Sequence, residues 1–278
     1  MKHFKLAILL LCSAFLTHTL YADTNTAAAA TVSSASDNND QTVDISNDLK
    51  VVATQKHEEN ADLYYQIDVN YPQLTGKLSP AAQNFNQTVA NMIAQSVQQF
   101  KNYVKLDQMH MQTLPEAERQ NSLQIDYDLD VITPDHHPII SLRMNIEGMQ
   151  AGRAHPYHTH QVLNYDLQTN KALSLGNLFK SRANYLNLIA KFCRTKLTST
   201  IQDKWIIAEG AKPTEKNYKN WNIEADGILI TFEEYQVAPY SYGAQEVEIP
   251  FSALKPLLAA NSVMAPCLKD SYSCIAEA

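Results

Sequence analysis

The sequence predicts an α+β fold in which antiparallel sheets are each covered by a helix, arranged as two interlocked subdomains. Three observations predict it. Residues 122–132 alternate apolar and polar side chains, as a strand with one covered face does. Ser79-Pro80 begins a stretch with apolar side chains at helical spacing, and residues 221–257 carry hairpin signals. Because a sheet buries its apolar face against another layer, strands mixed with amphipathic helices predict layered packing.

The first subdomain, residues 49–150, begins with two strands and a helix. Residues 50–56 and 63–71 are predicted to form an antiparallel pair with one covered face. Ser79 offers a side-chain oxygen to the helix N-terminus, and Pro80 suits the first helical position. The apolar stripe that would pack on the sheet consists of Phe85, Val89, Met92 or Ile93, Val97, Phe100 and Val104.

Further strands are predicted on both sides of the boundary between the subdomains. Residues 122–132 and 139–146 end the first subdomain. The second, residues 151–260, begins with a strand at 157–167 and a turn at 168–171. A helix follows, and its buried stripe would consist of Tyr185, Leu186, Ile189, Cys193 and Leu197.

Residues 221–257 form the unit around which the second subdomain is organised. Two strand patterns, 221–225 and 228–233, flank Asp226-Gly227, a dipeptide that favours a two-residue hairpin turn with positive φ. The second pattern is almost unbroken apolar, which indicates a strand covered on both faces. Residues 245–249 alternate as another strand, and 251–258 have a short helical pattern.

The N-terminal residues 1–22 have the pattern of a cleavable signal peptide, with two lysines, an apolar run and a small residue at Ala22. The run is shorter than the about 20 residues that a spanning helix needs, so we expect no stable membrane span. Residues 23–48 are small and polar, which predicts a flexible linker. Residues 261–278 would form a C-terminal tail. These features predict a periplasmic or secreted protein.

The charge balance excludes one class of partner and favours another. The formal net charge is -7, and loss of two lysines with residues 1–22 leaves 20 basic and 29 acidic side chains, or -9. An acidic chain does not neutralise phosphate, so we expect no nucleic-acid partner. It would attract a strongly basic protein, and lysozymes are commonly basic.

The segment DGILITFEEYQVAPYSYGAQEVEIPFSAL, residues 226–254, resembles the RsiV-type domain, the extracytoplasmic domain of lysozyme-sensing anti-sigma factors. The similarity continues in HPYHTHQVLNYDLQTNKALSLGNLF, residues 155–179, and more loosely in 51–148. Such domains also accompany peptidoglycan deacetylase domains and occur in uncharacterised envelope proteins. The resemblance implies an α+β fold and an envelope location, and it brings no shared catalytic residues.

The resemblance and the charge together predict a non-enzymatic binding protein whose partner is a lysozyme-like muramidase or peptidoglycan. Two alternatives stay open: an envelope enzyme or accessory subunit that uses a histidine cluster, and a purely structural envelope protein. The sequence has no G-x-S-x-G, H-E-x-x-H or C-x-x-C motif and no phosphate-binding glycine loop. We therefore assign no catalytic residue and no cofactor.

Two polar clusters are candidate sites. His155, His158 and His160 fall within six residues, and His158 and His160 would share one strand face, close enough for a metal. The competing interpretation, a half-exposed strand surface, is the stronger one. Asp126, Asp128 and Asp130 would also share a face, about 7 Å apart. They would form either a solvated face or a ladder that binds a cation or a basic protein.

The aromatic loop of the family-like segment is the candidate recognition site. It contains Tyr235, Pro239, Tyr240 and Tyr242. Aromatic side chains on a proline-stiffened turn serve as binding anchors at little entropic cost. The competing interpretation is that these rings pack inward and hold the fold.

Cys193, Cys267 and Cys274 remain after the predicted signal. In an oxidising compartment Cys267 and Cys274 would close a small loop and leave Cys193 as a buried thiol. A bridge from Cys193 to the tail is the main alternative.

Overall fold

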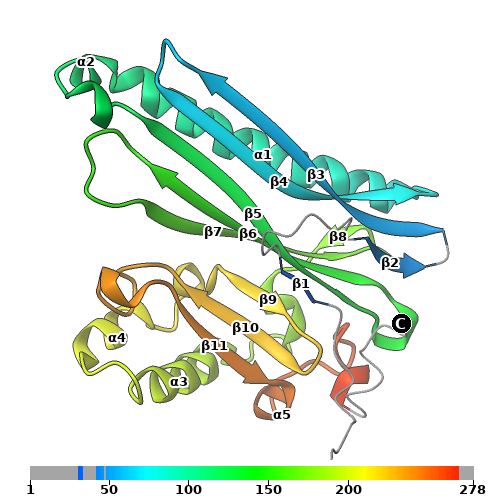
Figure 1. The fold of residues 1–278 in the computed structure, drawn as a ribbon. Helices are drawn as coiled ribbons and strands as arrows, with labels where there is room; N and C mark the ends of the chain where they lie inside the picture. The colour runs from blue at the N-terminus through cyan, green and yellow to red at the C-terminus, as the bar shows by residue number, and fades with distance from the viewer. Residues whose placement is uncertain (1–30, 34–41, 47, 269–278) are drawn as a thin grey trace, which may run out of the picture.

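The computed structural model describes residues 31–33, 42–46 and 48–268, and Figure 1 shows their arrangement. The predicted signal peptide, 1–22, and most of the predicted linker lie outside the described residues. None of the helices in the described part of the chain combines the length and apolar character that crossing a bilayer requires.

The predicted α+β class is confirmed: the structure has a large sheet, a small sheet and helices packed on both (Figure 1). The large sheet has the strand order β2-β3-β4-β5-β6-β7-β8, and β1 pairs with β5 beside β4. Its strands are β1 (Thr31–Ser33), β2 (Val43–Ser46), β3 (Leu49–Asn60), β4 (Tyr65–Gly76), β5 (Asn121–Ile132), β6 (Ile139–Met149), β7 (Tyr157–Asp166) and β8 (Lys171–Ala172).

The large sheet is antiparallel except where β4 and β5 run parallel, with Tyr65 opposite Asn121 and Val69 opposite Ile125. A parallel pair needs a crossover connection, and here α1 (Pro80–Leu106) and the short α2 (Gln108–Met111) lie in that crossover.

Helix α1 begins where the sequence predicts and covers the apolar face of the large sheet. The Ser79 hydroxyl accepts a hydrogen bond from the Ala82 amide at 3.2 Å, and Pro80 occupies the first turn. Phe85, Val89 and Val104 are fully buried against the sheet. The large hydrophobic core therefore lies between α1 and strands β3 to β7.

The small sheet forms a second layer with its own core (Figure 1). Its strand order is β11-β10-β9, and α3 packs on its apolar side. Strand β10 is buried along its whole length, as its unbroken apolar pattern predicts. The elements of this layer are β9 (Trp221–Ile223), β10 (Gly227–Phe232), β11 (Gln245–Pro250), α3 (Tyr185–Leu197), α4 (Lys204–Gly210) and α5 (Phe251–Leu254).

The structure differs from the predicted turn in this unit. The hairpin of β9 and β10 forms, but Ile223 is opposite Ile228 and the Glu224 amide bonds to the Gly227 carbonyl oxygen, so the two turn residues are Ala225-Asp226 and not Asp226-Gly227. Gly227 belongs to β10, where a Cβ would stand 2.4 Å from the Ile249 carbonyl oxygen. The glycine is needed for close approach of two backbones and not for positive φ.

Three predicted boundaries also differ. The large sheet continues past residue 150, because β7 and β8 pair onto β6 and Leu167 lies in the large core. Strand β2 lies inside the predicted linker because its apolar Val43 and Ile45 pack against that core. The predicted helix at 251–258 is regular only over α5, and helix α4 was not predicted from the sequence.

Replacing Gly227 by alanine should destabilise the fold by about 1 to 3 kcal/mol, because the added methyl group meets backbone that cannot move away easily. Gly176→Ala is the matched control, since its Cβ would meet only the end of the Tyr185 side chain, at 3.2 Å. Urea unfolding would measure both. Equal midpoints for the two variants would contradict this account of Gly227.

Candidate functional site

The polar face of the large sheet carries most of the candidate residues, arranged in rows by strand register. The first row is Gln124 on β5, Glu147 on β6 and His158 on β7. The second row is Asp126, Asn145 and His160, the third Asp128, Arg143 and Val162, and the fourth Asp130, Ser141 and Asn164. The predicted aspartate ladder therefore shares a face with two of the predicted histidines.

The third and fourth rows face the small sheet and bond to it. Arg143 donates to Asp128 at 2.8 Å within its own sheet, and to Thr231 at 3.1 Å and Glu246 on the small sheet. In the fourth row, Ser141 accepts hydrogen bonds from the Asn222 side chain and the Ile223 amide, both at 3.0 Å. Asp128 is thus part of the contact between layers.

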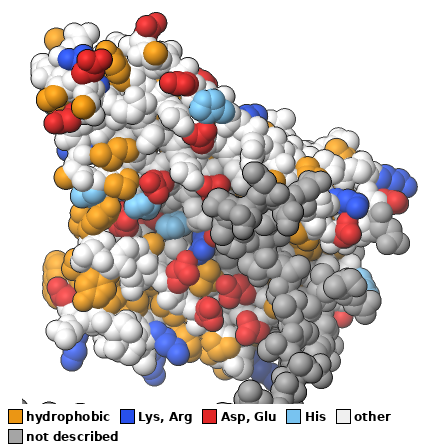
Figure 2. Space-filling model, viewed as in Figure 1, with side chains coloured by type: hydrophobic (Ala, Val, Ile, Leu, Met, Phe, Trp, Pro, Cys, Tyr) orange, Lys and Arg blue, Asp and Glu red, His pale blue; other side chains and the backbone are white. Residues whose placement is uncertain are grey.

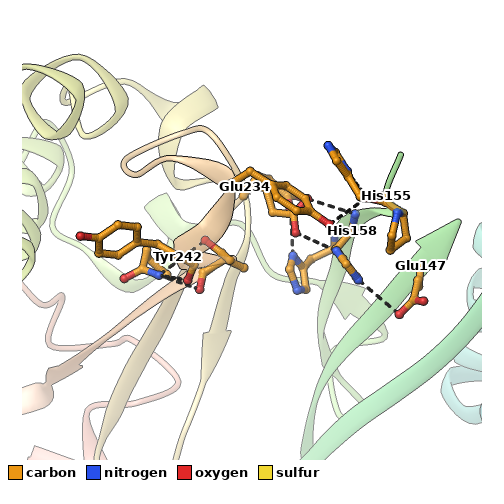
Figure 3. Close-up of polar contacts among 12 residues, drawn as sticks. Glu147, His155, His158, Glu234 and Tyr242 are labelled. Carbon is orange, nitrogen blue, oxygen red and sulfur yellow. Dashed lines mark hydrogen bonds and ion pairs between the residues drawn. The ribbon is translucent and has the colours of Figure 1, made fainter. Parts of the chain in front are cut away.

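The first and second rows contact the loop that follows β10 instead (Figure 3). The Nδ1 atom of His158 lies 2.7 Å from a Glu234 carboxylate oxygen, and its Nε2 atom lies 3.2 Å from Glu147. The Nδ1 atom of His160 lies 2.9 Å from Glu233, which also accepts the His160 amide at 3.0 Å. Two consecutive glutamates therefore hold two alternate histidines of β7.

Had the strand continued through Glu233 and Glu234, their side chains would point to opposite faces, so the strand pattern did not predict this pairing. The strand ends at Phe232, and Tyr235 has a positive φ of 62°. The chain therefore turns at these residues, and both carboxylates point to β7. Burial alone would raise the pKa of Glu233, but hydrogen bonds from His160 and Asn220 outweigh it and hold that pKa below its usual value.

The three predicted histidines do not come together as one cluster. His155 is exposed, stacks on Tyr240 with ring centroids 3.9 Å apart and does not join the other two. His158 and His160 each bond to a glutamate of their own. Within residues 31–33, 42–46 and 48–268, no three histidine, cysteine or acidic side chains lie close enough to hold a metal ion.

The aromatic loop lies beside this cluster. The Tyr240 hydroxyl donates to the Pro156 carbonyl oxygen at 3.1 Å, and the Tyr235 ring lies 5.7 Å from the Tyr240 ring. Tyr235 and Tyr242 are 60% and 50% exposed, and Pro239 is also exposed. Figure 3 shows Tyr242 on the side of the loop away from His158. The loop therefore presents rings on two sides while Tyr240 ties it to β7.

A second acidic group lies at the edge between the layers. Burial raises the pKa of Glu224 to about 7, and the neighbouring Glu248, Asp130, Asp226 and Glu246 add to the effect. A carboxyl whose folded-state pKa exceeds its unfolded value destabilises the fold as pH rises toward that pKa, because the folded state holds its proton more tightly.

Replacing Glu224 by glutamine should therefore stabilise the protein at pH 8, by about 1 to 2 kcal/mol, and change little near pH 4. The gain should develop between the unfolded pKa and about 7. Thermal melting across this pH range would measure it, with the exposed Glu59→Gln as control. A stabilisation of the same size at pH 4 would contradict the assignment to ionisation.

The structure distinguishes between the two predicted cysteine pairings. Cys193 is free and buried, and burial raises the pKa of its thiol to about 12, so the bridge from Cys193 to the tail is not formed. Cys267 is disulfide-bonded, while Cys274 lies outside the described residues.

We expect Cys267 and Cys274 to form the bridge. Peptide mapping of non-reduced protein should give one linked fragment that contains both cysteines and a separate peptide with a free Cys193. Alkylation of Cys193 only after denaturation would be consistent with its burial. A linked fragment without Cys274 would contradict the pairing.

Comparison with known proteins supports the RsiV-type resemblance. Residues 176–252 match the family described as "Protein of unknown function (DUF3298)". The chain is 30% identical over 199 residues to peptidoglycan-N-acetylmuramic acid deacetylase PdaC of Bacillus subtilis, covering 70% of this chain and 39% of PdaC. It is 26% identical over 201 residues to the anti-sigma-V factor RsiV of the same organism, covering 69% of this chain and 65% of RsiV.

The fold also occurs in a solved structure of a DUF3298 family member from Bacteroides fragilis, with a TM-score of 0.56 at 16% identity. That structure covers 80% of this chain, and the match covers 98% of the solved chain. This likeness shows a shared fold, and the sequence matches to DUF3298, PdaC and RsiV support an RsiV-type domain.

Proposed function

We propose that this chain, which carries an RsiV-type domain, is an envelope-associated, non-enzymatic binding protein that recognises a lysozyme-like muramidase. The observation that carries the proposal is the aromatic loop, residues 235–242. It exposes two large rings, Tyr235 and Tyr242, on a backbone that is fastened at several points. Exposed rings on a fixed backbone lose little entropy when a partner covers them.

The residues of the loop and its flanks fall into two groups: those that hold the loop in place, and the exposed rings that would contact a partner. Glu233, Glu234 and Tyr240 bond to β7 or to Pro156 beside it. Val237 and Ala238 are buried in the small core. Tyr235 and Tyr242 are the aromatic side chains of the loop that remain outward, which favours the binding interpretation for them over inward packing.

The charge of the molecule supports a basic partner. The formal net charge is -7, and acidic side chains lie on strands of both sheets, Glu147 on β6 and Glu246 and Glu248 on β11. On the face shown in Figure 2, acidic and histidine side chains gather in the middle of the molecule, with few lysine or arginine side chains among them. Such a surface speeds encounter with a basic protein.

A second candidate ligand is peptidoglycan, and the similarity to PdaC favours it because the name of that protein states an activity on this polymer. The match covers 39% of PdaC, so the activity of PdaC is not carried over to this chain. A sedimentation assay with purified, lysozyme-free peptidoglycan would separate the two ligands.

Replacing Tyr242 by alanine should weaken binding to a basic c-type lysozyme by about 1 to 3 kcal/mol, because a half-exposed ring becomes fully covered in the complex. The melting temperature should stay nearly unchanged. Isothermal titration calorimetry would give the affinity. Leu106→Ala, which removes an 87% exposed apolar side chain from the end of α1, is the matched control.

If wild-type protein binds no lysozyme at low salt, the proposal fails. It also fails if Tyr242→Ala and Leu106→Ala bind as tightly as the wild type.

The association should slow as salt rises from about 0.05 to 0.5 M, because ions screen the attraction between an acidic surface and a basic one. We expect the association rate to fall about tenfold or more while the dissociation rate changes less. Stopped-flow or surface-based kinetics would measure both rates. A salt-independent association rate would contradict the electrostatic part of the proposal.

A further inference from the structure

We propose that a pocket on the polar face of the large sheet binds an arginine side chain of the same basic partner, an inference that rests on the proposed function. The pocket measures about 120 Å³ and is lined by the first two rows and their neighbours: Gln124, Asp126, Asn145, Ile146, Glu147, His158, Thr159 and His160. Pockets for whole small molecules are about 300 to 1,000 Å³. This one has the size of a single side-chain end.

The charge of the pocket selects a cation. Asp126 and Glu147 contribute two carboxylates, and they stand on a diagonal of neighbouring strands. The Asp126 carboxylate accepts a hydrogen bond from Gln124 at 2.7 Å, and Glu147 contacts His158 at 3.2 Å. Among the residues that the structure describes, no lysine or arginine forms an ion pair with either carboxylate, and Arg143 of the next row pairs with Asp128 and Glu246 instead.

The next row of the same face shows which cation fits. In the third row, Arg143 stands opposite Asp128 and donates to it through Nε at 3.1 Å and a terminal nitrogen at 2.8 Å. In the second row, Asp126 takes the place that Asp128 has in the third. The residue opposite it is Asn145 and not an arginine, so this aspartate has no guanidinium across from it. A guanidinium from a partner would complete the second row by donating to Asp126, as both Nε and a terminal nitrogen of Arg143 donate to one carboxylate oxygen of Asp128 in the third.

His158, in the wall of the pocket, lies beside Glu147. His158 lies between two carboxylates, with Nδ1 2.7 Å from Glu234 and Nε2 3.2 Å from Glu147. An arginine in the pocket would give Glu147 further hydrogen-bond donors. Arginine suits this role better than lysine because its planar group bonds to more than one oxygen at once.

The pocket and the aromatic loop belong to one continuous surface. His158 forms the pocket wall and bonds to Glu234, the residue before the exposed Tyr235 (Figure 3). His155 precedes the same strand and stacks on Tyr240 of the loop. A single surface of the partner would therefore contact the exposed rings of the loop and also insert an arginine into the pocket.

The test compares Asp126→Asn and Glu147→Gln with Glu59→Gln, an exposed glutamate on β3, three strands away from β6 in the large sheet. Each pocket variant should bind a basic c-type lysozyme about tenfold more weakly, and the control should change less than twofold. Melting curves would check that all three variants fold. All three substitutions nearly preserve side-chain size, so we expect them to fold.

A second measurement does not depend on lysozyme. N-acetyl-arginine amide, titrated into the wild-type protein, should shift the imidazole NMR signals of His158, and N-acetyl-lysine amide should shift them less. The double variant Asp126→Asn, Glu147→Gln should show no shift. An equal response to the lysine compound would overturn the choice of arginine.

The outcomes separate the two proposals. If Tyr242→Ala weakens lysozyme binding but the pocket variants match Glu59→Gln, the pocket inference is overturned and the proposed function stands. If lysozyme does not bind but the arginine compound does, and the double variant abolishes its effect, the proposed partner is wrong and the pocket stands. If neither binds, both proposals are overturned.

Discussion

The arrangement of the molecule depends on how the polar face of the large sheet is covered. Helix α1 buries the apolar face, but the opposite face carries Asp128, Arg143 and Ser141, which need hydrogen-bond partners once a second layer lies on them. The small sheet supplies Thr231, Glu246 and Asn222 for this purpose. Arg143 bonds to both sheets, and its side chain is 16% exposed. Truncating it would leave Asp128 with a partly buried, less compensated charge.

The same contact fixes the position of the candidate site. Because the small sheet covers only the third and fourth rows, the first two rows stay open as the pocket, and the loop after β10 reaches β7 at their edge. The exposed rings of that loop therefore have a fixed position relative to the pocket. Had the small sheet extended one row further, Asp126 would have lain inside the contact with Asp128.

The sequence predicted those features that depend on local patterns. Ser79 and Pro80 marked the start of α1, and the alternation of residues 122–132 predicted which side of β5 is buried. Features set by contacts between distant segments were not predictable in this way. The parallel pairing of β4 with β5 leaves no mark in either strand, and the Asp226-Gly227 signal was outweighed by the close approach of Gly227 to Ile249.

The candidate site shows the same division. The aromatic loop and the aspartates that share one strand face could be identified in the sequence, which left open whether the rings are exposed, whereas the pairs His158–Glu234 and His160–Glu233 join residues more than 70 positions apart. Their one local signal was a pair of acids immediately after a buried strand, near two histidines spaced for one face. The signal can be interpreted only with the structure, in which β10 ends at Phe232 and Tyr235 has a left-handed conformation.

The parallel seam between β4 and β5 has a consequence for how the chain assembles. Five register pairs join these strands, whereas twelve join β3 to β4, and residues 77–120 separate the two strands of the seam. The β3–β4 hairpin and the β5–β6–β7 meander close through short connections, so we expect them to form first and the seam to form when α1 docks across it. The native sheet therefore joins two local folding units. Transient undocking of α1 would separate them at the β4–β5 seam before either unit unfolds.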